Sequence, residues 1–497
     1  MLFNSVDYVI FFPISIIVYY LLPNKVRYIW LLFASYYFYM SWNPQYALLI
    51  LASTLTTYVG GRVIQKEKEN NETSEGFKKK SKKWLIAVIV INLGLLVFFK
   101  YLNFGITNIN AVLSIAHVER SIPYLDILLP VGISFYTFQA LGYIIDVYND
   151  KVSAEKNFLK YALFVSFFPQ LVAGPIERTS NLMGQLSERH KLTFENFRVG
   201  VLWMLWGYFM KLVIADRVAI IVDAVYADPE TYSGVCIVVA TILFAIQIYC
   251  DFGGYTMIAR GSAKIMGINL MENFNAPYLS KNVAEFWRRW HISLSTWFKD
   301  YLYIPLGGNR KGKIRKYINI FVVFLVSGFW HGAAWGYVIW GGLNGLYQII
   351  GGSLQRTRDA VVSKCKIKRD AFSHQLFKWI VTFALVDFSW LFFRAKSISE
   401  SIRVLKNIAN INLYSLFDGT LFSFGVGRNE FYFVIVAIIL LFAVDAFKYK
   451  GIDVAKAILK QGMWLRVLIF AGLFLVVIML GVYGVEYDAS QFIYFQF

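Results

Sequence analysis

Long apolar stretches, separated by short polar or basic ones, recur along almost the whole chain. A helix that crosses a bilayer needs about 20 predominantly apolar residues, and it satisfies its backbone hydrogen bonds internally. The pattern therefore predicts an all-α polytopic membrane protein with about twelve transmembrane helices. The predicted spans lie near residues 8–22, 28–43, 45–64, 84–102, 125–148, 197–226, 232–256, 317–335, 337–354, 376–395, 431–447 and 464–483.

Two stretches interrupt this pattern in the first half of the chain. Residues 158–175 are apolar, but Pro169, Gly174 and Pro175 break the helical run, so we expect a re-entrant segment rather than a full span. Residues 65–83 are charged and poor in apolar side chains. This composition predicts a flexible loop, and its lysines favour the cytoplasmic side.

The stretch 257–316 is too charged to span a bilayer and too aromatic for an ordinary loop. Tryptophans such as Trp287 and Trp290 alternate with cations such as Arg288 and Arg289. Aromatic rings combined with cations are typical of helices that lie in the membrane interface. We therefore predict cytoplasmic interfacial helices in this stretch.

Lysine and arginine predict the orientation, because cytoplasmic loops of membrane proteins carry an excess of positive charge. The twelve-span scheme puts the four strongly basic loops on one side, which we expect to be cytoplasmic, and both termini on the other. The basic loops contain residues 78–83, 309–316, 356–370 and 448–460, whereas the loops 103–124, 227–231 and 396–430 carry less positive charge.

Composition supports a membrane protein and limits the classes of function. Of the 497 residues, 58% are hydrophobic and only 16% are charged, whereas typical soluble proteins have about 25% charged residues. Basic loops beside anionic lipid account for the net charge of +18, and nucleic-acid binding is not expected because no basic stripe lies outside these loops. The three cysteines are scattered without a CxxC pair, so neither a disulfide framework nor a metal site is predicted.

One of only five histidines lies in the apolar stretch "SGFWHGAAWG", residues 327–336. Ionisable groups at membrane depth are costly and often functional, and a neutral imidazole can accept a proton near neutral pH. Small residues around His331 allow a backbone or a ligand to approach closely, and Trp330 and Trp335 flank it. A packing histidine, hydrogen-bonded across helices, is the alternative, and the residue types alone do not decide between the two.

His291 and Asp251 are two further polar residues in aromatic surroundings. His291 follows "FWRRW" and is either part of an aromatic belt or a group that orients a substrate. The adjacent Arg288 and Arg289 suit phosphate or carboxylate ligands, but they suit lipid headgroups equally well. Asp251 lies late in an apolar span and needs a partner, so a structural role is favoured over catalysis.

Six motifs, taken together, resemble those of the membrane-bound O-acyltransferases. The resemblance covers nearly the whole chain, as a single domain over residues 1–497, and is closer to the integral membrane subunit of bacterial alginate O-acetylation systems than to the teichoic-acid D-alanyl transfer proteins. The motifs are "LLPVGISFYTFQALGYIIDVY" (128–148), "FFPQLVAGPIER" (167–178), "YCDFGGYTMIARGSAKIMGINLMENFNAPY" (249–278), "FWRRWHISLSTWFKDYLYIPLGGNR" (286–310), "SGFWHGAAWGYVIWGGLNG" (327–345) and "FIYFQF" (492–497).

The resemblance implies a fold, a reaction and partners. The fold would be a ring of about 11–13 transmembrane helices around a central tunnel in a bacterial cytoplasmic membrane. The reaction would be acyl transfer from a cytosolic thioester, acetyl-CoA, to a hydroxyl, without a metal. A periplasmic or extracellular partner of the SGNH-hydrolase type would place the acetyl group on a polysaccharide such as an alginate-like exopolysaccharide or a cell-wall polymer.

The same resemblance assigns expected roles to single residues. His331 matches the family's membrane histidine and would act as general base, and His291 matches its second functional histidine. Tyr494, in the predicted extracytoplasmic tail 484–497, would carry the acyl group as an ester by analogy with the teichoic-acid system, although a tyrosine there also suits an aromatic belt. The expected donor- or substrate-binding residues are Arg288, Arg289, Trp330, Trp335, Asp251 and Asn309.

Other functions stay open on the sequence alone. A D-alanyl-type exporter would take its acyl group from a carrier-protein thioester rather than from coenzyme A. A lipid or solute transporter would line its path with several charges, of which the chain has few: Asp146, Lys211, Asp216 and Asp251. A scaffold would account for the aromatic belts but not for a histidine inside an apolar segment.

Overall fold

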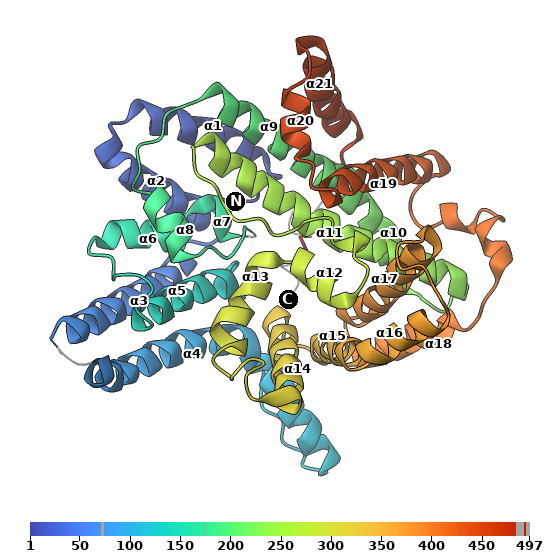
Figure 1. Ribbon diagram of the computed structural model, residues 1–497, viewed down its shortest axis with the longest axis horizontal. Coiled ribbons are helices and arrows are strands. Elements are labelled where there is room, and N and C mark those ends of the chain that lie inside the picture. Colours follow the sequence, from blue (N-terminus) through green and yellow to red (C-terminus); the bar gives the residue numbers. More distant parts are fainter. Residues whose placement is uncertain (71–73, 173, 484–491, 494–497) are drawn as a thin grey trace. The chain divides into compact units, whose positions relative to one another are not determined.

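The computed structural model describes residues 1–70, 74–172, 174–483, 492 and 493, without the side chains of residues 74–79. It is 75% helical, and none of the residues it describes forms a strand (Figure 1). The chain divides into two compact units. The first comprises Met1–Met204 with Ile258–Met271, and the second comprises Leu205–Met257 with Glu272–Phe497.

The first unit is built on long helices connected by short ones. α3 packs against both α4 and α5, and the three helices lie side by side (Figure 1). The elements of this unit are α1 (Val6–Leu21), α2 (Asn24–Met40), α3 (Tyr46–Glu69), α4 (Ser74–Ile115), α5 (Ile133–Tyr148), α6 (Phe158–Ser166), α7 (Phe168–Leu171), α8 (Thr179–Gln185) and most of α9 (Phe194–Tyr208).

Two predictions concern the connections in this unit. The apolar stretch 158–175 is interrupted, but at Phe167 between α6 and α7, where the backbone has φ −51° and ψ 112°, whereas Pro169 lies within α7. The re-entrant path stays a prediction. The charged segment 65–83, predicted to be a loop, is helical over most of its length, since α3 continues to Glu69 and α4 begins at Ser74. The charged end of α3 and the charged start of α4 continue the apolar parts of these helices. The hydropathy pattern alone does not distinguish such a charged helix end from a loop.

The second unit contains the remaining elements. They are the π-helix η1 (Phe209–Ala215), α10 (Asp216–Ala227), α11 (Gly234–Ile265), whose last turns belong to the first unit, η2 (Pro277–Leu279), α12 (Val283–Arg289), α13 (Ile292–Phe298), η3 (Lys299–Tyr303), α14 (Gly312–His331), α15 (Trp335–Ser353), α16 (Gln355–Lys364), α17 (Phe372–Arg394), α18 (Ile398–Ile408), η4 (Leu413–Leu416), η5 (Thr420–Phe422), α19 (Arg428–Tyr449), α20 (Val454–Leu459) and α21 (Met463–Leu480).

Six helices among the described residues are long and apolar enough to cross a membrane: α3, the Lys80–Ile115 part of α4, α11, α17, α19 and α21. The all-α polytopic membrane protein predicted from the sequence is therefore confirmed. The other predicted spans fall on helices that are shorter or less apolar, such as α1. The number of about twelve spans and the ring around a tunnel stay predictions.

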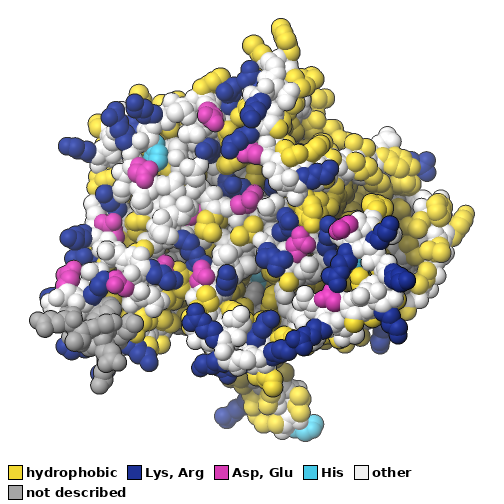
Figure 2. Space-filling model, viewed as in Figure 1, with side chains coloured by type: hydrophobic (Ala, Val, Ile, Leu, Met, Phe, Trp, Pro, Cys, Tyr) yellow, Lys and Arg dark blue, Asp and Glu magenta, His cyan; other side chains and the backbone are white. Residues whose placement is uncertain are grey.

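Basic side chains of the second unit are visible in two of its regions. Figure 2 shows Lys and Arg side chains over α16 and over the start of α14 on the face in view. These are the regions of the basic loops 309–316 and 356–370, whose position on the cytoplasmic side of the membrane stays a prediction.

The stretch 257–316 contains the short helices α12 and α13, and their place in the membrane interface stays a prediction. Their residues Trp287 and Trp290, with the adjacent His291, are buried inside the second unit. The alternation of rings and cations here serves internal packing, in which the rings turn inward and Arg288 stays exposed.

Glycines bring α14 and α15 into close contact. A Cβ atom on Gly341 would lie 2.3 Å from the carbonyl oxygen of Phe324, whereas one on the adjacent Gly342 would have only an ordinary contact at 3.6 Å, with Leu325. Small residues at such a crossing allow two helix backbones to approach. The pair Gly341 and Gly342 therefore offers a matched test of this packing.

We expect Gly341→Ala to lower the free energy of unfolding by about 1–3 kcal/mol, because the added methyl group clashes with backbone that cannot yield. Gly342→Ala gains the same helix propensity without the clash and is expected to be neutral or stabilising. Unfolding midpoints in detergent compare the two variants. Equal midpoints would show that α14 and α15 do not pack this closely.

Candidate active site

The two histidines singled out in the sequence lie together inside the second unit. The centroids of the His291 and His331 rings are 6.3 Å apart, with the rings in an edge arrangement. His291 is fully buried and His331 is 3% exposed. The sequence stretches that contain them meet where α12 packs against α15 and where the His291 ring approaches Trp330 of α14.

The end of α14 positions His331. It is the last residue of the helix, because Gly332 adopts an extended backbone with φ −167° and ψ 157°. Its ring meets aromatic rings edge-on: those of Trp330 at 4.9 Å, Trp340 at 5.0 Å and Phe393 at 5.5 Å between centroids. The imidazole therefore lies at a helix terminus within an aromatic enclosure contributed by α14, α15 and α17.

The small residues around His331 allow other parts of the chain to approach closely, which is one of the two uses that the sequence predicts. A Cβ atom on Gly332 would lie 2.1 Å from the Tyr337 ring, and one on Gly328 would lie 2.2 Å from the Tyr337 carbonyl oxygen. The space left by these two glycines is thus filled by the first turn of α15, and they permit tight packing of α14 against α15 beside His331.

A strained backbone positions His291. The residue has φ 43° and ψ 54° between α12 and α13, a left-handed conformation that non-glycine residues adopt rarely and often at functional sites. Asn273 fixes the segment that follows: its carbonyl accepts from the Ile292 N–H at 3.0 Å, and its side-chain oxygen accepts from the Ser293 hydroxyl at 2.6 Å. Asn273, which the sequence reading missed, thus holds the turn that aims His291.

The surroundings of His291 are apolar. Its ring lies edge-on to Phe252 at 4.7 Å and to Trp330 at 6.1 Å between centroids. Burial lowers the pKa of His291 to about 3, because a low-dielectric environment disfavours the charged form. His291 is therefore a neutral imidazole at physiological pH and a weak base.

This burial predicts a pH-dependent stability. The unfolded chain binds a proton at His291 near its ordinary pKa of about 6.5, whereas the folded chain does so only near pH 3. Below about pH 6.5 the unfolded state gains protons, so folding stability falls by about 1.4 kcal/mol per pH unit from this residue. Unfolding midpoints are measured at pH 7.5 and 5.5. We expect the difference between the two midpoints to be smaller in His291→Gln than in the parent and in the control His374→Gln. The same difference in all three proteins would contradict the burial of the His291 imidazole.

An asparagine on α15 ties the enclosure together. The side chain of Asn344 accepts from the Trp287 indole N–H at 3.1 Å and donates to the Trp340 carbonyl at 2.9 Å and to the Ser389 hydroxyl at 3.2 Å. It thereby links α12, α15 and α17. The motif "GGLNG" contains it, but nothing in its spacing indicated that a buried amide there connects the tryptophans.

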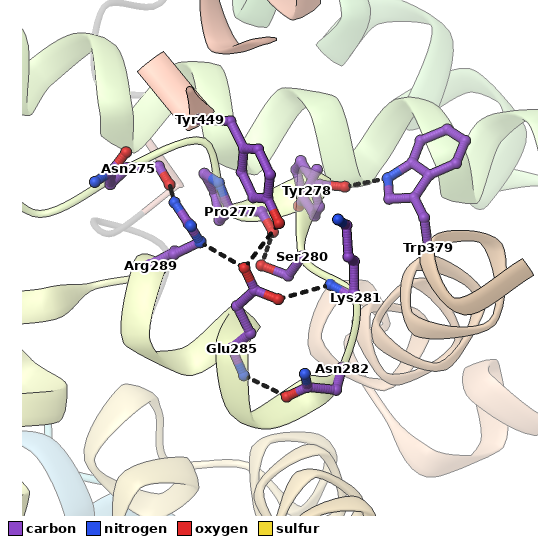
Figure 3. Close-up of polar contacts among 10 residues, drawn as sticks. All are labelled: Asn275, Pro277, Tyr278, Ser280, Lys281, Asn282, Glu285, Arg289, Trp379 and Tyr449. Atoms are coloured by element: carbon purple, nitrogen blue, oxygen red, sulfur yellow. Dashed lines mark hydrogen bonds and ion pairs between the residues drawn. The ribbon is translucent and has the colours of Figure 1, made fainter. Parts of the chain in front are cut away.

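Arg289 is committed to an internal network (Figure 3). Its guanidinium donates to Glu285 and to the Asn275 carbonyl, each at 3.1 Å, and stacks over the Tyr449 ring at 4.4 Å. Burial alone would raise the pKa of Glu285, but the Lys281 N–H, the Tyr449 hydroxyl and Arg289 together lower it below its ordinary value. Arg289 thus holds the loop before α12 and is a poor candidate for a donor phosphate.

Three other predicted binding residues lie at the surface of the second unit. Arg288 is exposed on α12, Asn309 is exposed in the turn before α14, and Trp335 is 50% exposed at the start of α15. The indole of Trp340 rather than that of Trp335 is the second one against His331. Trp330, in contrast, is 4% exposed and part of the enclosure as predicted.

Asp251 has the buried partner that its position requires. The carboxylate lies 2.7 Å from the Lys211 ammonium, which is also 2.7 Å from Asp216. Its other oxygen accepts a 2.8 Å hydrogen bond from the backbone N–H of Ile493. Phe252, the residue after Asp251, contacts the His291 ring. Ile493 is therefore hydrogen-bonded to the residue that precedes a contact of His291.

Tyr494 lies outside the described residues. The residues immediately before it, Phe492 and Ile493, are described and buried. The tail therefore enters the interior of the second unit directly before the tyrosine.

Comparison with known proteins adds independent information. A model of the membrane-bound O-acyltransferase family matches residues 149–395. A probable alginate O-acetylase AlgI of Pseudomonas syringae is 37% identical over 86% of this chain and 76% of that protein. A peptidoglycan O-acetyltransferase of Helicobacter pylori is 35% identical over 84% of this chain and 81% of its own, and a teichoic acid D-alanyltransferase of Bacillus subtilis is 30% identical over 46% and 60%.

Proposed function

This chain belongs to the membrane-bound O-acyltransferase family, and from that premise we propose that it provides acetyl groups for O-acetylation of an extracytoplasmic polysaccharide. As a multi-pass membrane O-acyltransferase, it transfers an acyl group to a hydroxyl oxygen. The relatives named for alginate and for peptidoglycan support a polysaccharide as the final acceptor. We propose that the protein is located in the bacterial cytoplasmic membrane.

The observation that carries the mechanism is the buried pair of histidines. In our proposal the His331 imidazole accepts the proton of the attacking hydroxyl, a role worth about 10²–10⁴-fold in rate. A carbon–oxygen bond then forms at the thioester carbonyl, the carbon–sulfur bond breaks, and the departing thiolate takes the proton from the imidazolium. No net charge is left in the apolar enclosure after the exchange.

His291 acts beside this base as a neutral group. Its low pKa makes it a weak base, so a hydrogen bond that orients the hydroxyl or the thioester suits it better than proton removal. The rings of Trp330, Trp340 and Phe393 against His331 exclude water, which would otherwise hydrolyse the thioester.

The donor we propose is cytosolic acetyl-CoA. The exposed Arg288 on α12 is available to its phosphates, since a guanidinium matches phosphate geometry, and Asn309 in the exposed turn is a second candidate contact. A carrier-protein thioester, as expected for a D-alanyl exporter, is the alternative donor and presents the same acyl chemistry to His331.

The first acceptor we propose is the Tyr494 phenol. Attack of its oxygen on the donor would give a tyrosyl acetyl ester, and an extracytoplasmic SGNH-hydrolase-type partner would then take the acetyl group and transfer it to the polymer. Attachment of the preceding residue Ile493 to Asp251, close to the contact between Phe252 and His291, supports this relay.

Acetyl transfer by the full-length chain tests the proposal. The protein in nanodiscs is incubated with radiolabelled acetyl-CoA, and coenzyme A release and label on the protein are followed together. We expect both, with label in the C-terminal peptide. Release of coenzyme A with label on another part of the protein would overturn the relay. A folded protein that neither releases coenzyme A nor accepts acetyl from a carrier-protein thioester would overturn the acyltransferase proposal in favour of a transporter.

A further inference from the structure

The buried Lys211, Asp216 and Asp251 form a charged cluster that the proposed acyl transfer does not use. The Lys211 side chain is 1% exposed and those of Asp216 and Asp251 are 7% and 3% exposed. Removing charges from water is expensive, and a buried ion pair is often no more stable than apolar residues of the same size. Such a cluster therefore calls for a reason other than stability.

The backbone that carries Lys211 has an unusual form. Residues Phe209–Ala215 form the π-helix η1, and the Asp216 N–H bonds to the Lys211 carbonyl. π-Helical turns interrupt regular α-helices and occur frequently at functional sites. Here the carbonyl of Leu212 accepts a 3.0 Å hydrogen bond from the Val482 N–H, which lies just beyond the end of α21.

The chain contacts this cluster again at Phe492 and Ile493. The Phe492 ring lies 4.1 Å from that of Tyr255, and the Lys211 ammonium lies 5.9 Å and 5.7 Å from these two rings. The two carboxylate oxygens of Asp251 have different partners: one forms an ion pair with Lys211, and the other accepts a hydrogen bond from the Ile493 N–H. One ammonium therefore orients the carboxylate that binds the tail.

We infer that Lys211 and Asp251 form a docking site for the C-terminal tail and act as positioning residues for the acyl relay. The ion pair fixes the Asp251 carboxylate so that its second oxygen receives the Ile493 N–H, and the Tyr255 ring holds Phe492 beside it. Tyr494 is the next residue in the sequence after this anchored pair. The inference rests on the proposed relay for its purpose, but the docking itself can be measured without any acyl donor.

Asp251→Asn is the direct test, with Asp445→Asn as its matched control. Lys211 and the Ile493 N–H contact different oxygens of Asp251. In asparagine one of these oxygens is replaced by an NH₂ group, which only donates, so one of the two contacts then brings two donors together. Asp445 is also buried in the second unit and accepts from the Tyr249 hydroxyl, a bond that asparagine can keep. Phe492→Ala provides a second test that leaves the buried charges unchanged.

Amide hydrogen exchange of the C-terminal peptide reports the docking in the protein alone. We expect Asp251→Asn and Phe492→Ala to speed exchange at Ile493 by about tenfold, the effect of losing one intramolecular hydrogen bond. Asp445→Asn is expected to leave it unchanged. Parental exchange at Ile493 in both test variants would overturn the docking site, whatever the acyl assay gives.

Acetyl label on the C-terminal peptide then reports the positioning role. We expect both test variants to lower the rate constant for tail acylation by about tenfold or more, with an unchanged KM for acetyl-CoA, because Arg288 and Asn309, the donor contacts that we propose, are kept in both. Faster exchange with a parental acylation rate would overturn the positioning role but not the docking. Failure of the relay itself has a separate signature, since Tyr494→Phe would then keep the parental transfer rate.

Discussion

Replacing His331 with alanine is expected to reduce acyl transfer by about 10²–10⁴-fold, because the hydroxyl nucleophile then has no general base. The imidazole lies at the end of α14 inside rings from α14, α15 and α17. His291 cannot replace it, since its pKa of about 3 leaves it a poor proton acceptor.

Coenzyme A release and label on the protein, measured over a range of acetyl-CoA concentrations, check this expectation. The rate constant is expected to fall while KM changes little, as is usual when a group acts mainly in the transition state. His374→Ala, a histidine at the start of α17, serves as a control for loss of an imidazole and is expected to keep the parental rate. A parental rate in a folded His331→Ala protein would remove the general base from the mechanism.

The sequence predicted the membrane fold well because its signal is strong at the level of whole segments. A long apolar run such as the predicted span 232–256 has few structural alternatives in a bilayer, and from Gly234 onward it lies in α11, which continues to Ile265. The charged stretch 65–83 was less predictable. A helix that continues past the apolar region exposes polar side chains just as a loop does, so α3 and α4 extend further than hydropathy indicates.

Within the site, the sequence predicted the reactive side chains better than their supports. His291 and His331, both singled out from the sequence, lie together, and Asp251 has a buried cationic partner. Asn273 and Asn344 were missed because no sequence motif marks an asparagine whose side chain fixes a turn or hydrogen-bonds to several helices. Their roles depend on contacts between segments far apart in sequence, such as Asn344 with Trp287.

Two pairs of residues that are equivalent in the sequence have different environments in the structure. Arg289 and Arg288 are equivalent in the sequence, but the turn of α12 directs one to Glu285 and leaves the other exposed. Trp335 and Trp340 differ in the same way, since both lie on α15 but one indole is half-exposed and the other lies against His331. Such differences follow from the phase of a helix, which depends on how it is packed rather than on composition.

Tyr494→Phe is expected to abolish acetyl label on the C-terminal peptide and to lower acetylation of the polysaccharide by on the order of 10³-fold or more, since loss of an acceptor oxygen removes the covalent intermediate. Phenylalanine keeps the ring, so the neighbouring contacts of Phe492 with Tyr255 and of Ile493 with Asp251 are expected to persist. The change thus removes one oxygen atom and leaves the anchor of the tail in place.

Cells that carry the parental or the variant chain, with the rest of their acetylation system intact, allow both readouts to be compared: ester on the peptide by mass spectrometry and acetyl groups on the polymer. Tyr414→Phe is the matched control, because Tyr414 is a 70% exposed phenol in the loop 396–430, which the charge pattern puts on the same side of the membrane. A variant that acetylates polymer at the parental rate without forming the ester would mean that His331 delivers the acetyl group to another hydroxyl. Loss of both signals in Tyr494→Phe, with unchanged exchange at Ile493, would instead tie acyl transfer to the one oxygen that the tail delivers.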